Sequence, residues 1–581
     1  MNTQFHRVIL LSLASLLGFP ISAYSAAADV VEGPTIELPK FIIQDTRELP
    51  PAEAWRHTEI SGFEILSNAS EAATRKLLRD FELFRFALNA AWPIEAKTEI
   101  PARLIVCGSG NSFDSFKSSS EAGPEKGTVS IALRDQDQAV IILDLQSSTL
   151  NLAIANNTGT NTTREVEVDH YKQFYRAYIQ YVFGRTKPQP PAWLIEGVAQ
   201  IVMRMDFTRN YIIFGKLDSP VAKKTTTPSG DPDAVVEDPS TPVPDQDFNL
   251  ALQKQPLLPL DKFFSISQDS PEALNPLGDN VWAKQSYAFV HLCLYGRGKR
   301  YQKSFIQFVR RCGEAPVTEV MFKECFGLSY KKMAAELRGY IDFTDYDYQK
   351  LTARAGTEFS EPAEITIRDA TDAEVGRIKG EALQLAGHSD AARIAFLAPY
   401  VRGARDPDLL ASFGLLEHAG QRDDKARKLL EAAAIGKTTR ARAYSTLASM
   451  RLADAINTPD RADGKLSSQQ TIGVLEAAFE ARGHPPAIAG TYEIIADAWL
   501  HSSVKPKREH LAVLNEGILK FPTNGQLLYK TAVLKLQSGF VEDAAPLIEM
   551  GSEMTFDPAL KESFAKLQAA LAELKNAKPA P

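Results

Sequence analysis

Cysteine is scarce in this chain. Only four cysteines occur among 581 residues, at Cys107, Cys293, Cys312 and Cys325. None of them forms a CxxC pair, so the spacing does not indicate zinc-finger chemistry. Two states remain open, because spacing alone cannot separate them: four buried free thiols, or a single Cys312–Cys325 bridge.

An excess of basic residues is also missing. The chain has 65 Lys and Arg against 72 Asp and Glu, which gives a net charge of −7. Binding to nucleic acid depends on a basic face that neutralises phosphates. We therefore do not expect nucleic acid as a partner. The composition is otherwise that of an ordinary globular protein, and the length accommodates two to four domains.

Long apolar runs are absent beyond the first residues. Arg7 precedes a largely apolar run at 8–19, and small residues follow at 22–28. A positive charge, a short apolar run and small residues are typical of a signal peptide. The run is shorter than the ~20 residues that span a bilayer. We predict that residues 1–28 are a signal peptide, that the mature protein is periplasmic or secreted, and that no membrane span remains after cleavage.

Several common catalytic patterns are lacking as well. No phosphate-binding loop or dinucleotide fingerprint occurs. Ser109 lies between glycines but lacks the G-x-S-x-G frame of hydrolase nucleophiles. No Ser/His/Asp or Cys/His set is evident. The sequence therefore does not indicate a nucleophilic triad or a nucleotide-binding loop.

The stretch from 61 to 345 has the pattern of an α+β domain, preceded by an extended, Pro-rich lead-in at 29–60. Short apolar runs predict strands, and longer runs with a 3.6-residue period predict helices. The predicted strands are 63–66, 103–107, 129–133 and 139–143, and the predicted helices are 70–92, 165–183, 192–205 and a helical stretch from 249 to 345. Residues 218–248 are polar and rich in proline, so they cannot bury enough apolar surface to offset their ordering entropy. We predict that they form a disordered insertion.

Residues 370–575, which follow a predicted linker at 346–369, have the pattern of paired helices. Gly387 and Gly420 each close a predicted helix, and they lie about one 34-residue repeat apart. Gly539 marks a later copy. This pattern resembles divergent tetratricopeptide repeats, and an irregular helical bundle is the other interpretation. Both predict an all-α, solenoid-like scaffold.

One segment carries the functional clue. Residues 193–199 read Trp-Leu-Ile-Glu-Gly-Val-Ala and follow a predicted helix at 165–183, and residues 285–291 read Gln-Ser-Tyr-Ala-Phe-Val-His. The order resembles the peptidase MA-like gluzincins, in which an HExxH helix precedes a W-x-x-E-G-x-A helix and a later Q-S-W-A-x-x-H helix. The resemblance implies an α+β gluzincin-like domain at 61–345, followed by the tetratricopeptide-like solenoid.

The ligand residues depart from that family. In HExxH the two histidines bind zinc, and the glutamate activates a water molecule. Here the resemblance places Asp169, His170 and Gln173 at those three positions, and only Glu196, the third ligand position, is retained. His291 is a possible relic of substrate binding, although a lone histidine on an apolar helix is more often a core residue.

The departures predict no catalytic residues, no bound metal and no cofactor. The oxygens of Asp169, Gln173 and Glu196 leave a calcium site open, because calcium prefers oxygen ligands; a plain polar cluster is the simpler interpretation. We expect an exported, non-catalytic pseudo-metallopeptidase whose helical repeats bind a protein or peptide partner. The alternative is an active zinc-dependent metallopeptidase of the gluzincin class with an altered site.

Overall fold

The computed structural model describes most of the chain. The described residues are 36–41, 50–91, 100–110, 112–117, 128–146, 149–155, 161–184, 189–217, 246–313, 315–343, 345–354, 357–359, 364–554 and 557–576. The predicted signal peptide lies outside them. Residues 218–245 of the predicted insertion lie outside them as well.

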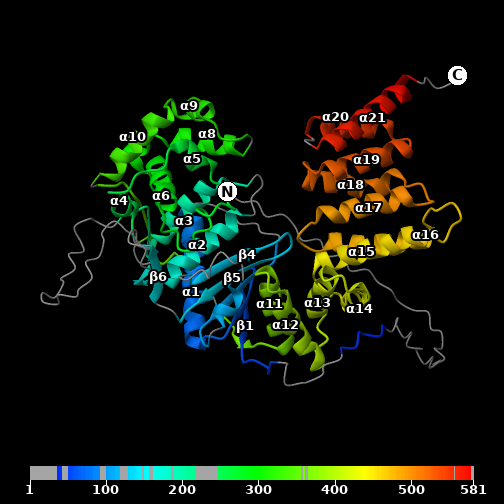
Figure 1. Cartoon of the computed structure of the whole chain (residues 1–581), viewed down its shortest axis with the longest axis horizontal. Helices are drawn as coiled ribbons and strands as arrows, with labels where there is room; N and C mark the ends of the chain where they lie inside the picture. The colour runs from blue at the N-terminus through cyan, green and yellow to red at the C-terminus, as the bar shows by residue number, and fades with distance from the viewer. Residues whose placement is uncertain are drawn as a thin grey trace, which may run out of the picture. The chain divides into compact units, whose positions relative to one another are not determined.

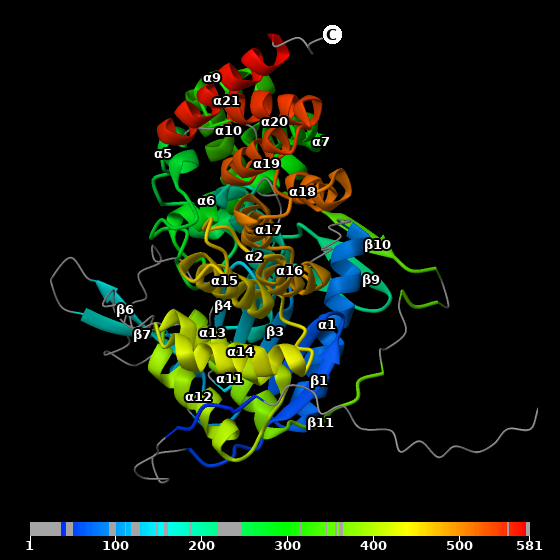
Figure 2. The same cartoon turned by 90° about the vertical axis from the view of Figure 1, so that its right-hand side faces the viewer.

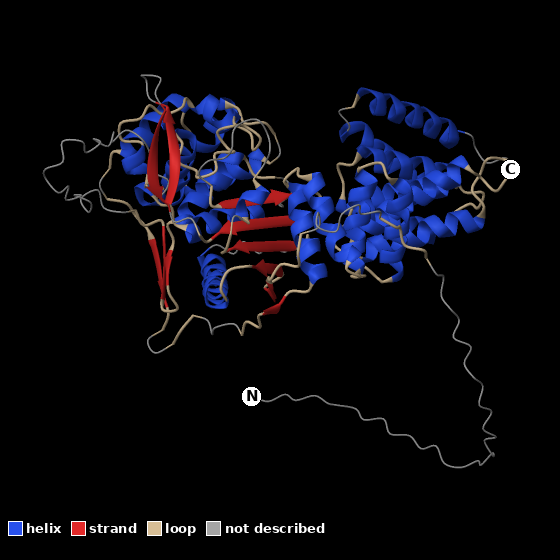
Figure 3. Ribbon diagram, turned by 60° about the horizontal axis from the view of Figure 1, so that its bottom comes forward, coloured by secondary structure: helices blue, strands red, loops and turns tan. Residues whose placement is uncertain are grey.

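A six-stranded mixed sheet forms the centre of the first part (Figure 3). Its strands follow the order β11-β1-β2-β3-β5-β4. The neighbours β2 and β3, and β3 and β5, are parallel, and the other pairs are antiparallel. The strands are β1 (Arg56–Ile60), β2 (Phe63–Ser67), β3 (Ala102–Cys107), β4 (Ser130–Arg134), β5 (Ala139–Asp144) and β11 (Arg368–Asp369). The four predicted strands are therefore confirmed, while β1 lies in the predicted lead-in and β11 in the predicted linker.

The sheet is covered on both faces. Leu104 and Val106 of β3 join one apolar core, together with residues of α1 (Glu71–Ala91). Ile105 and Cys107, which alternate with them, join a second core with residues of α11 (Asp372–Leu385). Successive side chains of a strand point to opposite faces. The continuous apolar run in β3 is explained by this double burial, because the first helix of the helical region packs on the second face.

Two smaller sheets complete the strand content of the described residues. An antiparallel pair joins β6 (Thr149–Ala155) and β7 (Asn161–Glu167), seen in Figure 2, and a three-stranded sheet has the order β10-β9-β8. The strands of the three-stranded sheet are β8 (Asp206–Phe207), β9 (Tyr211–Phe214) and β10 (Gln349–Thr352), the last within the predicted linker. The predicted helix start at 165 is wrong, because residues 165–167 pair with β6.

The remaining helices of the first part lie where helical periodicity was found, but in shorter pieces. They are α2 (His170–Phe183), α3 (Ala192–Met203), α4 (Phe248–Ala251), α5 (Leu260–Ser265), α6 (Val281–Leu294), α7 (Gly296–Lys299), α8 (Gln302–Cys312), α9 (Glu319–Phe326) and α10 (Tyr330–Ile341). Pro259 precedes α5, and Gly327 ends α9 in the left-handed conformation with φ of 69°. These residues interrupt what the sequence pattern joined into one stretch.

From residue 372 onward, the described chain is helical. The helices after α11 are α12 (Ser389–Val401), α13 (Pro407–Ala419), α14 (Asp423–Ile435), α15 (Ala441–Asn457), α16 (Ser468–Gly483), α17 (Ala489–His501), α18 (Arg508–Lys520), α19 (Gly525–Gln537), α20 (Val541–Met554) and α21 (Pro558–Asn576). From α11 to α19, each odd-numbered helix contacts both the helix that follows it and the next odd-numbered helix. Figure 1 shows the later helices stacked in chain order. This arrangement is consistent with a helical repeat.

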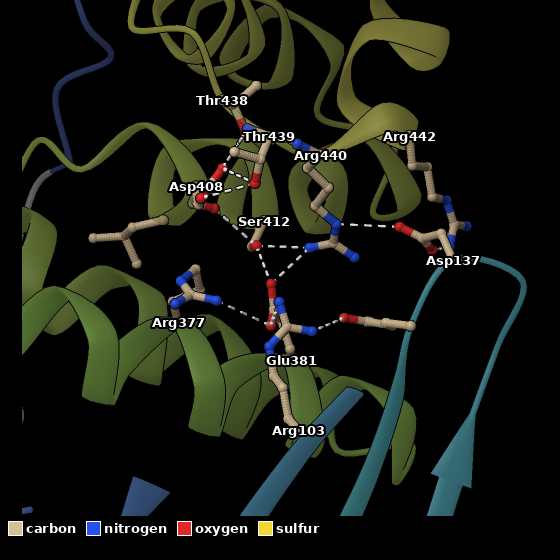
Figure 4. A network of polar contacts seen from close by, with 12 residues as sticks. Arg103, Asp137, Arg377, Glu381, Asp408, Ser412, Thr438, Thr439, Arg440 and Arg442 are labelled. Carbon is tan, nitrogen blue, oxygen red and sulfur yellow. Dashed lines mark hydrogen bonds and ion pairs between the residues drawn. The ribbon is translucent and has the colours of Figure 1, made fainter. Parts of the chain in front are cut away.

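A buried network of charges joins the sheet to the helical region (Figure 4). Glu381 of α11 is fully buried; Arg103 Nη2 of β3 lies 3.0 Å from its Oε2, and Arg440 Nη1 lies 2.9 Å from its Oε1. Arg440 Nε also donates to Asp137 Oδ2, in the turn between β4 and β5, at 3.2 Å. Arg377 of α11 donates to Glu64 of β2. Every one of these carboxylates therefore has a guanidinium partner across the junction.

The four cysteines are free thiols in this structure, and the Cys312–Cys325 bridge is not formed. Burial raises the pKa of the Cys107 and Cys312 thiols to about 12. They are therefore protonated at neutral pH. None of the helices within the described residues is long and apolar enough to cross a membrane.

Candidate functional site

The residues predicted at the degenerate metal positions lie at and just after the start of α2. Asp169 is the N-cap of this helix: its Oδ1 accepts hydrogen bonds from the backbone N–H groups of Tyr171 (2.9 Å) and Lys172 (3.2 Å). A carboxylate at this position satisfies amides that have no partner inside the helix. Asp169 therefore caps α2, a structural role that its alignment with a zinc-ligand position did not indicate.

His170 and Gln173 follow on the first turns of α2. His170 is half-buried, and Gln173 is buried. Gln173 Nε2 donates to the backbone oxygen of Leu277 at 3.4 Å. Within the described part of the chain, His170 Nδ1 and Gln173 Oε1 are buried without a hydrogen-bond partner.

Glu196 lies on α3, a helix in which every residue is buried. Its carboxylate accepts hydrogen bonds from Arg176 of α2, with Nε at 3.1 and 3.2 Å from the two oxygens and Nη2 at 2.9 Å from Oε2. Gln200, one turn further along α3, donates to Glu196 Oε1 at 2.8 Å. Arg176 and Glu196 thus form a bidentate, charge-assisted pair, the strong form of this interaction. Both oxygens of the retained ligand position are engaged.

A loop at 275–278 closes over this pair with its backbone. Arg176 donates to the carbonyl oxygens of Asn275 (3.0 Å) and Pro276 (2.7 Å), and Gln200 donates to that of Gly278 (2.8 Å). Gly278 has φ of 65°, and a Cβ there would lie 2.6 Å from Glu196 Oε1. Only glycine combines this backbone conformation with so close an approach. The loop at 275–278 therefore packs closely over the cluster of Arg176, Glu196 and Gln200.

The cluster extends to a third helix. Lys284 of α6 is buried, and its Nζ donates to Gln200 Oε1 at 3.1 Å. The neighbouring Gln285 does not join the cluster, because its amide exchanges hydrogen bonds with the backbone of Leu258, at 2.8 and 3.0 Å. Buried polar groups need partners, and this chain of contacts from Arg176 to Lys284 supplies them.

The rest of the W-x-x-E-G-x-A segment packs tightly. Trp193 contacts Phe264, Phe289 and Phe308, with ring centroids 5.4 to 5.9 Å apart. A Cβ on Gly197 would lie 2.6 Å from the backbone oxygen of Ser286 on α6. The motif therefore has a packing explanation: tryptophan and glycine face α6 and its surroundings, while Glu196 faces α2.

His291 forms no hydrogen bond with the residues of this cluster in the described structure. Its Nε2 is 2.7 Å from the backbone oxygen of Gly215, and its Nδ1 is 2.8 Å from the hydroxyl of Tyr340. Since a carbonyl oxygen only accepts, Nε2 carries the hydrogen, and Nδ1 accepts from Tyr340. Burial lowers the pKa of His291 to about 4. The residue is a neutral, satisfied core histidine in this structure.

A cavity of about 450 Å³ lies beside the cluster. It is bounded by β4, α2, α3 and the loop before α6. Its walls include Ser130, Arg176, Gln180, Glu196, Asn275 and Trp282. The cavity therefore reaches Glu196, one of the predicted site residues.

Sequence reasoning missed Arg176 and the loop at 275–278. The sequence does contain a pattern that points to Arg176. Together with Gln173 and Gln180 it forms a polar stripe at helical spacing on a helix rich in aromatic residues. The loop has no such pattern, because its contribution is made by backbone oxygens. Among the described residues, no group of three or more His, Cys, Asp or Glu side chains is arranged to hold a metal ion.

No protein-family model matches this chain. No curated protein matches it either. The resemblance to gluzincins therefore rests on the sequence motifs alone.

Proposed function

We propose that this chain is an exported, non-catalytic pseudo-metallopeptidase of the peptidase MA-like type, whose helical region is a tetratricopeptide-like solenoid that binds a protein or peptide partner. One observation carries the non-catalytic role: Glu196, the only retained ligand position, is held by Arg176 in a buried ion pair. The guanidinium supplies the positive charge that a zinc ion would otherwise bring to this carboxylate.

The donor set supports this proposal. Zinc binds nitrogen, sulfur and carboxylate ligands through lone pairs that are free to coordinate. Both Glu196 oxygens accept hydrogen bonds from Arg176 or Gln200, and Asp169 Oδ1 accepts from helix amides. Gln173 offers only an amide oxygen. The residues present do not fit zinc, and the same engagement of oxygens argues against calcium.

The contacts among helices support the family resemblance. The segments that carry it are α2, α3 and α6, and α3 packs against both of the others. Helix α6, which is distant in sequence, thus packs beside the two helices that carry Arg176 and Glu196. The backbone carbonyls of the loop at 275–278 then bind Arg176 and Gln200 beside Glu196.

The partner-binding role rests on the helical region. Its helices follow one another as pairs whose first members are in contact. Stacked helical repeats present extended surfaces that suit peptide and protein ligands. The predicted signal peptide, with Arg7 before its apolar run, supports export.

Metal analysis of the purified chain without its predicted signal peptide tests the proposal. We expect far less than one zinc per chain after brief incubation with zinc and desalting, and no hydrolysis of a casein substrate. Glu196→Gln and the remote Glu493→Gln serve as a matched pair. One zinc per chain that is lost in Glu196→Gln but kept in Glu493→Gln would overturn the non-catalytic role.

A further inference from the structure

A short segment near the start of the described chain lies against the helical region. Leu38 and Phe41 pack against the second apolar core, to which α12, α13 and α14 contribute residues. Pro39, between them, is buried, and its backbone oxygen accepts a hydrogen bond from the hydroxyl of Tyr400 at 2.9 Å. A residue before proline favours an extended backbone. The segment Leu38–Phe41 is called the strap below.

The ring of Phe41 contacts two aromatic rings and two cationic side chains. It stacks on Phe413 of α13, with centroids 5.1 Å apart and planes at 21°, and meets the Tyr400 ring edge-on at 5.5 Å. Lys425 Nζ of α14 lies 4.9 Å from the ring centroid, and the Arg393 guanidinium of α12 lies 5.7 Å from it. Aromatic pairs and cations over a ring face both favour this arrangement.

Three helices thus recognise three features of the strap. The apolar core contacts Leu38, the Tyr400 hydroxyl donates to the carbonyl of Pro39, and aromatic and cationic side chains of the three helices contact the ring of Phe41. The recognised features are separated by fixed short spacings along an extended chain. Features of this kind are those by which grooves recognise short linear segments.

We propose that α12, α13 and α14 form a binding site for extended segments of the type Leu-Pro-x-Phe, and that the strap fills this site in cis. The inference rests on the proposed binding role of the helical region and names the kind of segment that role would take. The short connection between Phe41 and Pro50 keeps the strap at a high effective concentration, of order millimolar for linkers of this kind. A partner must therefore compete with the strap.

The test uses a chain that folds with its strap in place. A specific protease site is inserted between residues 43 and 49, the folded chain is cut, and the released N-terminal piece is removed by gel filtration. A fluorescein-labelled peptide of residues 36–41, Ile-Glu-Leu-Pro-Lys-Phe, is then titrated with cut or uncut chain, and its anisotropy is followed. We expect binding to the cut chain that is at least about tenfold tighter than to the uncut chain.

Variants of the pocket and of the peptide sharpen the result. Lys425→Ala is expected to weaken binding of the peptide to the cut chain by about two- to fivefold, the size of an exposed cation–π contact. Lys428→Ala, an exposed lysine on the same helix, is the matched control and should leave binding unchanged. A peptide with Phe41→Ala should lose most of its affinity, because the ring fills the pocket.

Equal binding to cut and uncut chains, no binding to the cut chain, or an equal loss in Lys425→Ala and Lys428→Ala would each overturn the inference. Full-length Phe41→Ala offers a second measurement without cleavage, since it should also expose the site to the peptide. The proposed pseudo-metallopeptidase role fails by a different measurement, the zinc content, so the two failures are distinguishable.

Discussion

At the residue scale, His291 and the Arg176–Glu196 pair are buried groups with specific partners. His291 keeps one hydrogen on Nε2 for the Gly215 carbonyl and accepts from Tyr340 at Nδ1. Arg176 and Glu196 neutralise each other. For His291, whose pKa is lowered by burial, the protonation state is part of the stability of the fold.

The lowered pKa of His291 predicts a pH-dependent loss of stability. Its pKa is about 4 in the folded protein, against about 6.5 for a free histidine. Between these values only the unfolded chain takes up the proton, so stability falls as the pH drops from about 6.5 to 4, by roughly 3 kcal/mol in total. Urea unfolding of wild type and His291→Gln across this range measures it. The glutamine does not titrate, so the variant should show a shallower slope; equal slopes would contradict the assignment.

The Arg176–Glu196 pair predicts strong coupling between two substitutions. Arg176→Met or Glu196→Met alone leaves an unpaired buried charge and should cost about 3–5 kcal/mol. The double variant removes both charges, so its cost should fall below the sum of the two by about 2 kcal/mol. Denaturant unfolding of the four proteins completes the cycle. Additive costs would mean that the pair contributes no specific interaction.

At the element scale, α3 shows how a motif can be required by packing alone. Gly197 allows its helix to approach α6 so closely that an added Cβ would lie 2.6 Å from Ser286 O and 2.4 Å from a methyl of Val290. The obstructing atom on Ser286 is backbone, so it cannot rotate away. This contact sets the distance between the helices that carry Glu196 and Lys284.

A pair of glycine substitutions separates close packing from helix propensity. Gly197→Ala should destabilise the protein by about 1–3 kcal/mol, because the helices must move apart. Gly473→Ala, in the middle of α16, should stabilise it by about 0.5–1 kcal/mol, since nothing lies within 4 Å of the added Cβ and alanine is the better helix former. Thermal or urea unfolding compares the two. A neutral Gly197→Ala would mean that α3 and α6 are not in close contact.

At the scale of the whole molecule, the sheet and the helical region are joined by apolar packing and by ion pairs. Strands β3 and β5 contribute alternate residues to the core that contains α11. Beside it, each of three carboxylates meets an arginine from the opposite side of the junction: Glu64 meets Arg377, Asp137 meets Arg440, and Glu381 meets Arg103. The junction is therefore built from residues that lie hundreds of positions apart.

Acid is predicted to weaken this junction through Glu64. Burial alone would raise its pKa, but hydrogen bonding from His57 and the charges of Arg377 and Arg103 lower it well below the usual range. A carboxyl with a lowered pKa contributes stability above its unfolded pKa of about 4.3 and loses it as the pH falls further. Unfolding between pH 5 and 3 should be less pH-dependent in Glu64→Gln than in wild type. Glu71→Gln, whose side chain is 55% exposed, is the control and should retain the wild-type dependence.

Local sequence patterns predict the local elements. The continuous apolar run of β3, the pair of strands around Asp135–Asp137 and the helices before and after Pro191 all follow from apolar patterning and from glycine and proline, which act over a few residues. The helix pairs from residue 372 onward were predictable for the same reason. The start of α2 was not predictable in this way. It depends on hydrogen bonds from helix amides to Asp169 and on the pairing of residues 165–167 with β6, which apolar periodicity does not report.

The surroundings of Glu196 are set by tertiary contacts. The family resemblance implied that two histidine ligands were replaced, but the sequence could not show that Arg176 donates to Glu196 or that the carbonyls of 275–278 cover the pair. It likewise gave no sign that Phe41 rests between Phe413 and Lys425. Periodicity reports which face of an element is buried, whereas the partner of a buried charge or ring is set by elements that folding brings together from distant parts of the chain.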